Sequence, residues 1–337
     1  MSTTRFPDGR RSFFERFFFD WFPGEALGAA RLYFGFGLIA YLFSQYRQLL
    51  VLDPAGAQFH YTLPIWYFDL LGIDQMVPWL NVPVMAILVA ACVLFALGRW
   101  TKPAIIVILI AICYLKGVRD SISGDVHHRE VPIVALLVLF FASKCDQVFG
   151  MDARRKGLPG IADWEGSWPL RAMQVYIAMF YFWALVAKLR LSGLAWFTEG
   201  GRIQDVLVAR SLRDGIGADG LPVNLPQAYE LAQNTDLVFV FGAAVFVFEL
   251  FIPLILFVRD WRLRLFMLIG AATFHFTNYY LLNVQFYLFP FVFVTFFNMA
   301  LVHRWLKARL QAGGVVAGDN ARINWLPELD SNQRHTD

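Results

Sequence analysis

Charged residues are scarce in this sequence. Asp, Glu, Lys and Arg make up 16% of the 337 residues, whereas hydrophobic residues make up 58%, and the mean hydropathy is +0.51. A soluble domain of this size could not bury so much apolar surface, but a lipid bilayer can accept it. The composition therefore predicts an integral membrane protein whose main partner is the lipid bilayer.

Basic clusters and paired cysteines are also missing. The formal net charge is only +3, and no basic run is interleaved with stacking aromatics, so we expect no nucleic-acid partner. Cys92, Cys113 and Cys145 lie within or beside apolar runs and lack CxxC spacing. We interpret them as small hydrophobic side chains and predict neither a disulfide framework nor a metal site.

The N-terminal segment lacks the features of a signal peptide. Residues 1–22 contain neither a continuous apolar region nor a small-residue cleavage site. Aromatic residues recur in it at the spacing of an amphipathic helix: Phe13, Phe14, Phe17, Phe18 and Trp21. We expect a retained segment, 1–22, on the cytoplasmic membrane surface, then a transmembrane bundle, 23–303, and a polar cytoplasmic tail, 304–337.

Long apolar stretches recur along the bundle. A spanning helix needs about 20 mostly apolar residues, with about 17 as a lower limit. The stretches that meet or approach this length are Ala26–Phe43, Val82–Gly98, Pro103–Val118, Val131–Phe149, Pro169–Leu191, Leu237–Val258, Leu263–Leu282 and Val284–Val302. The last two are joined by almost no loop, which predicts a tight turn near Asn283. We predict an all-α, multi-pass transmembrane helical bundle of about eight spans.

The basic residues are distributed unequally between the two sides of the bundle. With a cytoplasmic N-terminus, 19 of the 29 Lys and Arg residues fall on the cytoplasmic side and eight on the other, while Arg31 and Lys188 lie within spans. This positive-inside asymmetry predicts that both termini are cytoplasmic, and we expect the protein in a bacterial inner membrane. The long loops 44–81 and 192–236 then lie outside, and the second contains a short amphipathic helix near Ile203–Leu212.

Ionisable residues within spans are costly, so each is a candidate functional residue. Four lie in the predicted spans: Arg31, Lys188, Glu249 and His275. The direction of the chain places Lys188 and His275 toward the outer side. Arg31 and Glu249 lie deeper, and they could neutralise each other.

Each candidate also has a structural interpretation. Lys188 could extend its ammonium group to the membrane interface while its stem stays in lipid. His275 could form a hydrogen-bond pair with Asn278, one turn later. The pair His127-His128, at the outer boundary of the fourth span, could lie in a solvated loop. Adjacent side chains on a helix point in different directions, which argues against a metal at that pair.

Several short motifs contain these candidate residues. They are Tyr181-Phe182-x-Ala184-x-x-x-Lys188-Leu189, followed by Trp196-Phe197-x-x-Gly200, then Phe274-His275-x-x-Asn278, Arg31-x-x-x-Gly35, and the pair His127-His128 before a span. Together they resemble the horizontally transferred transmembrane (HTTM) domain family, the membrane part of vitamin K-dependent γ-carboxylase. The resemblance extends from about Arg31 to about Val302.

The resemblance implies a site at the outer side of the bundle. Lys188 matches the active-site lysine of the carboxylase, which is regarded as the base that deprotonates the reduced vitamin. Burial disfavours an ammonium group, and a neutral amine can accept a proton. We assign Lys188, His128 and His275 as candidate catalytic residues, and Asn278, His127 and Trp196 as candidate residues for binding a quinone or reduced vitamin K. His127 remains an alternative to His128 in the catalytic position.

Two classes of function remain open. In the carboxylase a large β-rich lumenal domain helps to bind the protein substrate, whereas a polar tail follows the bundle here. The resemblance therefore implies the bundle but not glutamate carboxylation. The first hypothesis is a carboxylase-like or quinone-linked enzyme that uses Lys188 as a base on a flat lipophilic molecule. The alternative is a transporter, or a binding or scaffold protein, whose intramembrane polar residues relay protons. The sequence points to no particular protein partner.

The predicted topology can be tested with reporter fusions. A reporter joined after Leu310 should behave as cytoplasmic and one inserted near Asp219 as external, because the basic residues favour the side that carries the termini. The measurement is the activity of reporters that work on only one side of the membrane. An exported C-terminal reporter would mean an odd number of spans and would contradict the outer position of Lys188.

Overall fold

The computed structural model describes residues 12–50, 59–61, 63–124, 130–196, 201–212, 215–217, 221–223, 225–284, 286 and 288–312. These residues are predominantly helical. The one sheet among them pairs β1 (Phe59–His60) with β2 (Gln75–Met76) in antiparallel register. The predicted all-α class is confirmed.

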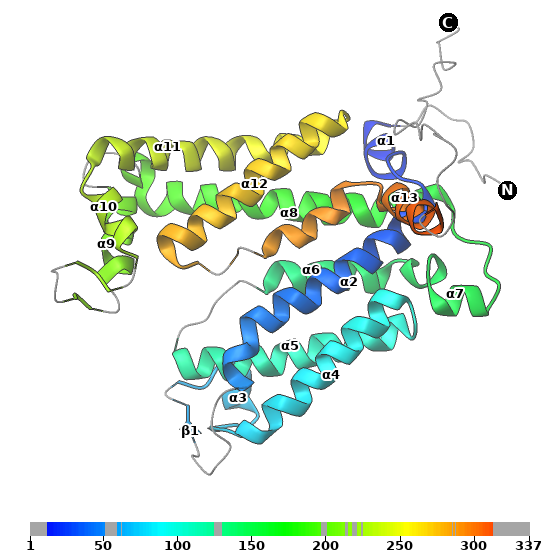
Figure 1. Cartoon of the computed structure of the whole chain (residues 1–337), viewed down its shortest axis with the longest axis horizontal. Coiled ribbons are helices and arrows are strands. Elements are labelled where there is room, and N and C mark those ends of the chain that lie inside the picture. Colours follow the sequence, from blue (N-terminus) through cyan, green and yellow to red (C-terminus); the bar gives the residue numbers. More distant parts are fainter. Residues whose placement is uncertain are drawn as a thin grey trace, which may run out of the picture. The chain divides into compact units, whose positions relative to one another are not determined.

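The α-helices are α1 (Phe13–Phe19), α2 (Gly24–Tyr46), α3 (Trp66–Leu70), α4 (Pro78–Leu97), α5 (Thr101–Ser123), α6 (Val131–Ala142), α7 (Met151–Arg155), α8 (Asp163–Ser192), α9 (Arg202–Ser211), α10 (Pro226–Ala232), α11 (Thr235–Phe251), α12 (Trp261–Leu282) and α13 (Met299–Ala312) (Figure 1). Among the described residues, the 3₁₀-helices are η1 (Arg47–Leu50), η2 (Cys145–Gln147), η3 (Gly193–Trp196), η5 (Ile252–Phe257) and η6 (Phe289–Phe296). The chain divides into two compact units, Met1–Ala300 and Leu301–Asp337. The second unit is described only in α13.

Five helices among the described residues are long and apolar enough to cross a membrane. They are α2 with η1, α4, α8 with η3, α11 with η5, and α12. A sixth is counted if η6 and the helix that follows it form one broken span. The chain is therefore an integral membrane protein with helical spans. The predicted number of eight spans and the cytoplasmic termini stay predictions.

Three of the expected spans are not continuous α-helices. In the stretch 237–258, the 3₁₀-helix η5 follows α11. In the stretch 131–149, only the 12-residue α6 is regular, and η2 follows it. In the stretch 284–302, η6 is a 3₁₀-helix, and the chain before it turns at Asn283, whose φ is +50°. The turn at Asn283 agrees with the sequence, whereas the 3₁₀-helix was not predicted, because hydropathy measures apolar length and not the hydrogen-bond pattern of the backbone.

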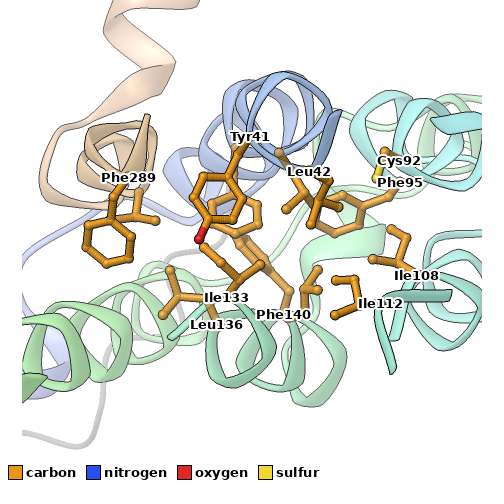
Figure 2. Close-up of a cluster of buried hydrophobic side chains, with 14 of the residues drawn as sticks. Tyr41, Leu42, Cys92, Phe95, Ile108, Ile112, Ile133, Leu136, Phe140 and Phe289 are labelled. Atoms are coloured by element: carbon orange, nitrogen blue, oxygen red, sulfur yellow. The ribbon is translucent and has the colours of Figure 1, made fainter. Parts of the chain in front are cut away.

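The first span lies at the centre of the larger unit. Its helix α2 packs against α4, α8 and η6. Figure 2 shows side chains that fill the space between α2, α4, α5 and α6, including Tyr41, Phe95 and Phe140. The Phe140 ring lies 5.2 Å from that of Phe34 and 5.4 Å from that of Phe95, so aromatic side chains supply much of this core.

One end of this unit carries α1, α7 and the turn between α4 and α5 (Figure 1). We call it the inner end, because the charge asymmetry predicts that it is cytoplasmic. The buried Arg31 of α2 donates there to three backbone carbonyl oxygens beyond α6: Cys145, Val148 at 3.2 Å and Phe149 at 2.8 Å. Lys102 of α5 donates in the same way to the carbonyl oxygens of Phe140, Phe141 and Ser143.

Carbonyl groups at the ends of the 3₁₀-helices η5 and η6 accept hydrogen bonds from buried arginines in the same manner. Arg171 of α8 donates to the carbonyl oxygen of Leu256 at 2.8 Å. Arg264 of α12 donates to Val258 at 2.5 Å and to Phe296 at 2.7 Å. The last carbonyl groups of a helix have no partner within that helix, and lipid offers none. Cationic side chains from neighbouring helices therefore make these irregular segments compatible with a membrane.

The predicted aromatic helix near the N-terminus is present as α1, which packs against α8. Arg171 donates to the carbonyl oxygen of Phe17 at 3.0 Å. Its guanidinium carbon also lies 4.0 Å from the ring centre of Phe17 and 3.9 Å from that of Trp21. The aromatic spacing therefore reflects cation–π and packing contacts with the bundle as well as an exposed face formed by Phe13 and Phe14.

The contact between α2 and α4 depends on a glycine. A Cβ atom added to Gly35 would lie 2.6 Å from Ala96 Cβ, whereas one added to Gly270 of α12 would meet nothing within 4 Å. Gly35→Ala should therefore lower the free energy of unfolding by about 1–3 kcal/mol, the usual effect of overpacking. Gly270→Ala should be neutral or stabilising, because Ala favours a helix. Thermal unfolding of both variants in mild detergent checks this, and equal melting temperatures would contradict it.

Candidate functional site

The predicted catalytic lysine forms an ion pair inside the bundle. The Nζ atom of Lys188, on α8, lies 2.5 Å from Oε1 of Glu249, on α11. The Glu249 side chain is 2% exposed and the Lys188 side chain 19% exposed. The pair is therefore largely removed from water, and the ammonium of Lys188 is held by a carboxylate rather than by the membrane interface.

The expected pairing of Arg31 with Glu249 was wrong. Arg31 donates to backbone carbonyl oxygens at the inner end, and Glu249 bonds to Lys188. The sequence analysis placed Arg31 and Glu249 at a similar depth and Lys188 nearer the outer side, so the predicted depth in the membrane favoured the wrong partner for Glu249. The irregular segment after α6, within the stretch 131–149 expected as one span, supplies the acceptors that Arg31 needs.

Trp196 lies beside this ion pair. Helix α8 ends at Ser192. The next residue, Gly193, has a φ of +57° and a ψ of −143°, which favour glycine, and η3 then brings Trp196 over Lys188. The Lys188 Nζ atom lies 5.5 Å from the centre of the indole ring. Trp196, predicted to bind a cofactor, is thus a neighbour of the predicted catalytic lysine.

His275 contacts α8 as well. Its Nε2 atom lies 2.6 Å from the hydroxyl oxygen of Tyr181, which precedes Lys188 by two helical turns. The imidazole is 3% exposed and packs against the rings of Phe286 and Phe289. The expected hydrogen-bond pair with Asn278 is not formed among the described residues, because His275 Nε2 bonds to Tyr181 and its Nδ1 has no partner.

Three buried polar atoms of these residues have no hydrogen-bond partner within the described part of the chain. They are Glu249 Oε2, Trp196 Nε1 and His275 Nδ1. Unpaired buried polar atoms are uncommon, and a functional or ligand-binding role is one of the usual reasons for them. A narrow apolar cavity of about 10 Å³ adjoins Tyr181, enough for about one water molecule.

The remaining predicted site residues are Asn278, His127 and His128. Asn278 is half-buried near the end of α12, and its carbonyl oxygen accepts from the Val284 amide at 3.3 Å. His127 and His128 lie outside the described residues. Glu130, which follows them, bonds to Arg119 at 2.7 Å, so this carboxylate belongs to an ion pair between α5 and the start of α6.

Sequence reasoning missed Tyr181 as the partner of His275 and Glu249 as the partner of Lys188. The seven-residue spacing of Tyr181 and Lys188 places both on one face of a helix, and this spacing was the signal that could have identified Tyr181. No sequence signal distinguished Lys188 from Arg31 as the partner of Glu249. Among the described residues, no group of three or more His, Cys, Asp or Glu side chains is arranged to hold a metal ion.

The fold and this site define the class of protein, a helical integral membrane protein with a buried Lys–Glu pair beside an aromatic–histidine cluster. Comparisons with protein-family models, with curated proteins and with solved structures found no match.

A double-mutant cycle tests the assignment of the ion pair. Lys188→Met or Glu249→Leu alone should each lower the free energy of unfolding by about 3–5 kcal/mol, because each strands a buried charge. The double variant should cost less than the sum, with a coupling of about 0.5–3 kcal/mol. Arg31→Leu combined with Glu249→Leu is the control and should be additive within about 0.5 kcal/mol. Coupling in the control but not in the first cycle would contradict the structure.

Proposed function

We propose that this chain is a membrane enzyme of the HTTM type that binds a flat lipophilic quinol and uses Lys188 to remove a proton from its hydroxyl group. The observation that carries the proposal is the buried Lys188–Glu249 pair beside the indole ring of Trp196. The motif resemblance to the carboxylase active-site lysine gives independent support, as does the clustering of unpaired polar atoms around these residues.

The ion pair explains how Lys188 can supply a neutral amine. In this proposal the Lys188 ammonium passes the proton that it shares with Glu249 Oε1 to that carboxylate when the ligand binds, which leaves a neutral amine beside a carboxylic acid. The amine then accepts the proton of the ligand hydroxyl: an O–H bond breaks, an N–H bond forms, and the electron pair stays on the ligand oxygen. The resulting ammonium lies where it stabilises that negative charge.

The other residues orient the ligand in this proposal. Trp196 offers a flat face and an unpaired N–H donor that suits a quinone-type oxygen. The Tyr181 hydroxyl holds His275 Nε2, which leaves Nδ1 for a second polar contact. The donor set and the aromatic side chains support the choice of a flat ligand with polar atoms at its edge. When bound, such a quinol supplies the acidic hydroxyl group and the capacity for redox chemistry.

Proton-coupled transport is the second candidate, and the broken helices favour it. Transporter sites are commonly built from interrupted helices, and α11 passes into the 3₁₀-helix η5 after Glu249. However, the described ends of η5 and η6 bond to Arg171 and Arg264 rather than facing the Lys188 site. Proton flux through liposomes without quinone, lost in Glu249→Gln, would favour transport over the enzyme.

The base role of Lys188 can be tested by substitution and amine rescue. In lipid nanodiscs supplied with a short-chain naphthohydroquinone, the deprotonated quinol is oxidised by dioxygen, which is reduced. Dioxygen consumption should fall by about 10²–10⁴-fold in Lys188→Arg and Lys188→Ala, since neither arginine nor alanine can serve as the base. Ethylamine should restore part of the rate in Lys188→Ala, increasingly as pH rises and more free amine is present. Guanidinium should not restore it.

Lys116 provides a matched control. It is also a largely buried lysine, with a side chain 15% exposed and bonded to a carboxylate, Asp120. Lys116→Arg and Lys116→Ala should keep the wild-type rate and show no response to ethylamine. If Lys188→Arg retains full activity, Lys188 is an anchoring or structural residue and the enzyme proposal fails.

A further inference from the structure

A second candidate binding site lies at the inner end of the larger unit, separate from Lys188. A hollow of about 200 Å³ opens there beside the turn between α4 and α5. Its lining combines two acidic, two basic and four uncharged residues: Asp146, Asp152, Lys102, Lys156, Trp100, Thr101, Pro103 and Leu158. The volume suits a small polar group and is below the size of typical pockets for drug-sized ligands, about 300–1,000 Å³.

The walls of the hollow are held rigidly. The amide of Trp100 donates to Asp152 Oδ2 at 2.7 Å, and the amide of Asp152 donates to the carbonyl oxygen of Gly98 at 3.1 Å. Trp100 has a φ of +50°, a conformation that non-glycine residues rarely adopt and that these hydrogen bonds retain. Lys102 closes another side through its bonds to the carbonyl oxygens at the end of α6.

Other polar groups of the lining remain available to a ligand. Within the described residues, the side chains of Asp146 and Lys156 form no hydrogen bond or ion pair, whereas the Lys156 amide donates to the carbonyl oxygen of Asp152 at 3.0 Å. The buried hydroxyl group of Thr101 has no partner there. The deep cations are already engaged, because Lys102 and the nearby Arg31 direct their donors at backbone carbonyls. The hollow therefore offers a free carboxylate, a free hydroxyl group and, on the exposed Lys156, a free ammonium.

This combination matches a zwitterion at the membrane surface. The candidate span α4 ends at Leu97, which places the hollow close to the end of that span, and the exposed indole of Trp100 is typical of an aromatic residue at a membrane interface. We infer that the hollow binds the phosphoethanolamine headgroup of a membrane lipid, with the ligand ammonium at Asp146 and its phosphate at Lys156. Ammonium–carboxylate and ammonium–phosphate hydrogen bonds are charge-assisted, which favours this headgroup over one with a quaternary amine.

Lipid titration of the full-length protein in detergent tests the inference. Phosphatidylethanolamine should raise the melting temperature more than phosphatidylcholine or phosphatidylglycerol at equal concentration. Of the three lipids, it alone combines a phosphate with an ammonium group that has N–H donors. Asp146→Asn and Lys156→Gln should each weaken its apparent affinity by about tenfold or more, as expected for a lost charge-assisted hydrogen bond. Arg155→Gln is the matched control, because Arg155 is exposed beside Lys156 but does not line the hollow.

Three outcomes would overturn the inference. They are equal stabilisation by phosphatidylcholine, unchanged affinity in both Asp146→Asn and Lys156→Gln, and equal affinity for soluble phosphoethanolamine, which would assign the hollow to a free metabolite instead of a lipid. The Lys156 side chain is exposed, and the only bond of Lys156 among the described residues is through its backbone amide, so Lys156→Gln should fold normally and keeps the test valid if Asp146→Asn does not.

Discussion

The hydrogen bonding of buried backbone carbonyl groups is the constraint on which this structure depends. The chain leaves the regular α-helical pattern after α6, in η5 and in η6, and each departure exposes carbonyl oxygens that lipid cannot satisfy. Arg31, Lys102, Arg171 and Arg264 reach these oxygens from neighbouring helices. A guanidinium with five N–H donors can serve several carbonyls at once, so a few arginines support several irregular segments.

This constraint also determines which charges are left for chemistry. Since the donors of Arg31 are directed at carbonyl oxygens, Glu249 pairs with Lys188 instead. The cations that support the backbone gather at the inner end, whereas the Lys188–Glu249 pair lies beside η3, at the opposite end of α8. Structural and candidate functional charges are therefore separated along the bundle.

The candidate site and the inner hollow differ in chemistry. Lys188 lies beside the indole ring of Trp196, and Tyr181, two turns earlier on α8, bonds to His275, so aromatic side chains surround the candidate site. The inner hollow is polar, and its free groups are of both signs. A lipid headgroup held there would brace the turn between α4 and α5, next to the carbonyl groups that Arg31 supports.

Composition and hydropathy determined the membrane class, the helical class and the approximate limits of α2, α4, α8, α11 and α12. The amphipathic spacing of 203–212 also predicted α9. These properties depend on residues close together in the chain, which a sequence records directly. Only the tertiary structure decided that α6 stops after 12 residues, that Arg31 serves carbonyl groups and that Glu249 pairs with Lys188. Such partners are distant in sequence, and several buried charges at similar depth compete for them, so the choice follows from how the helices pack.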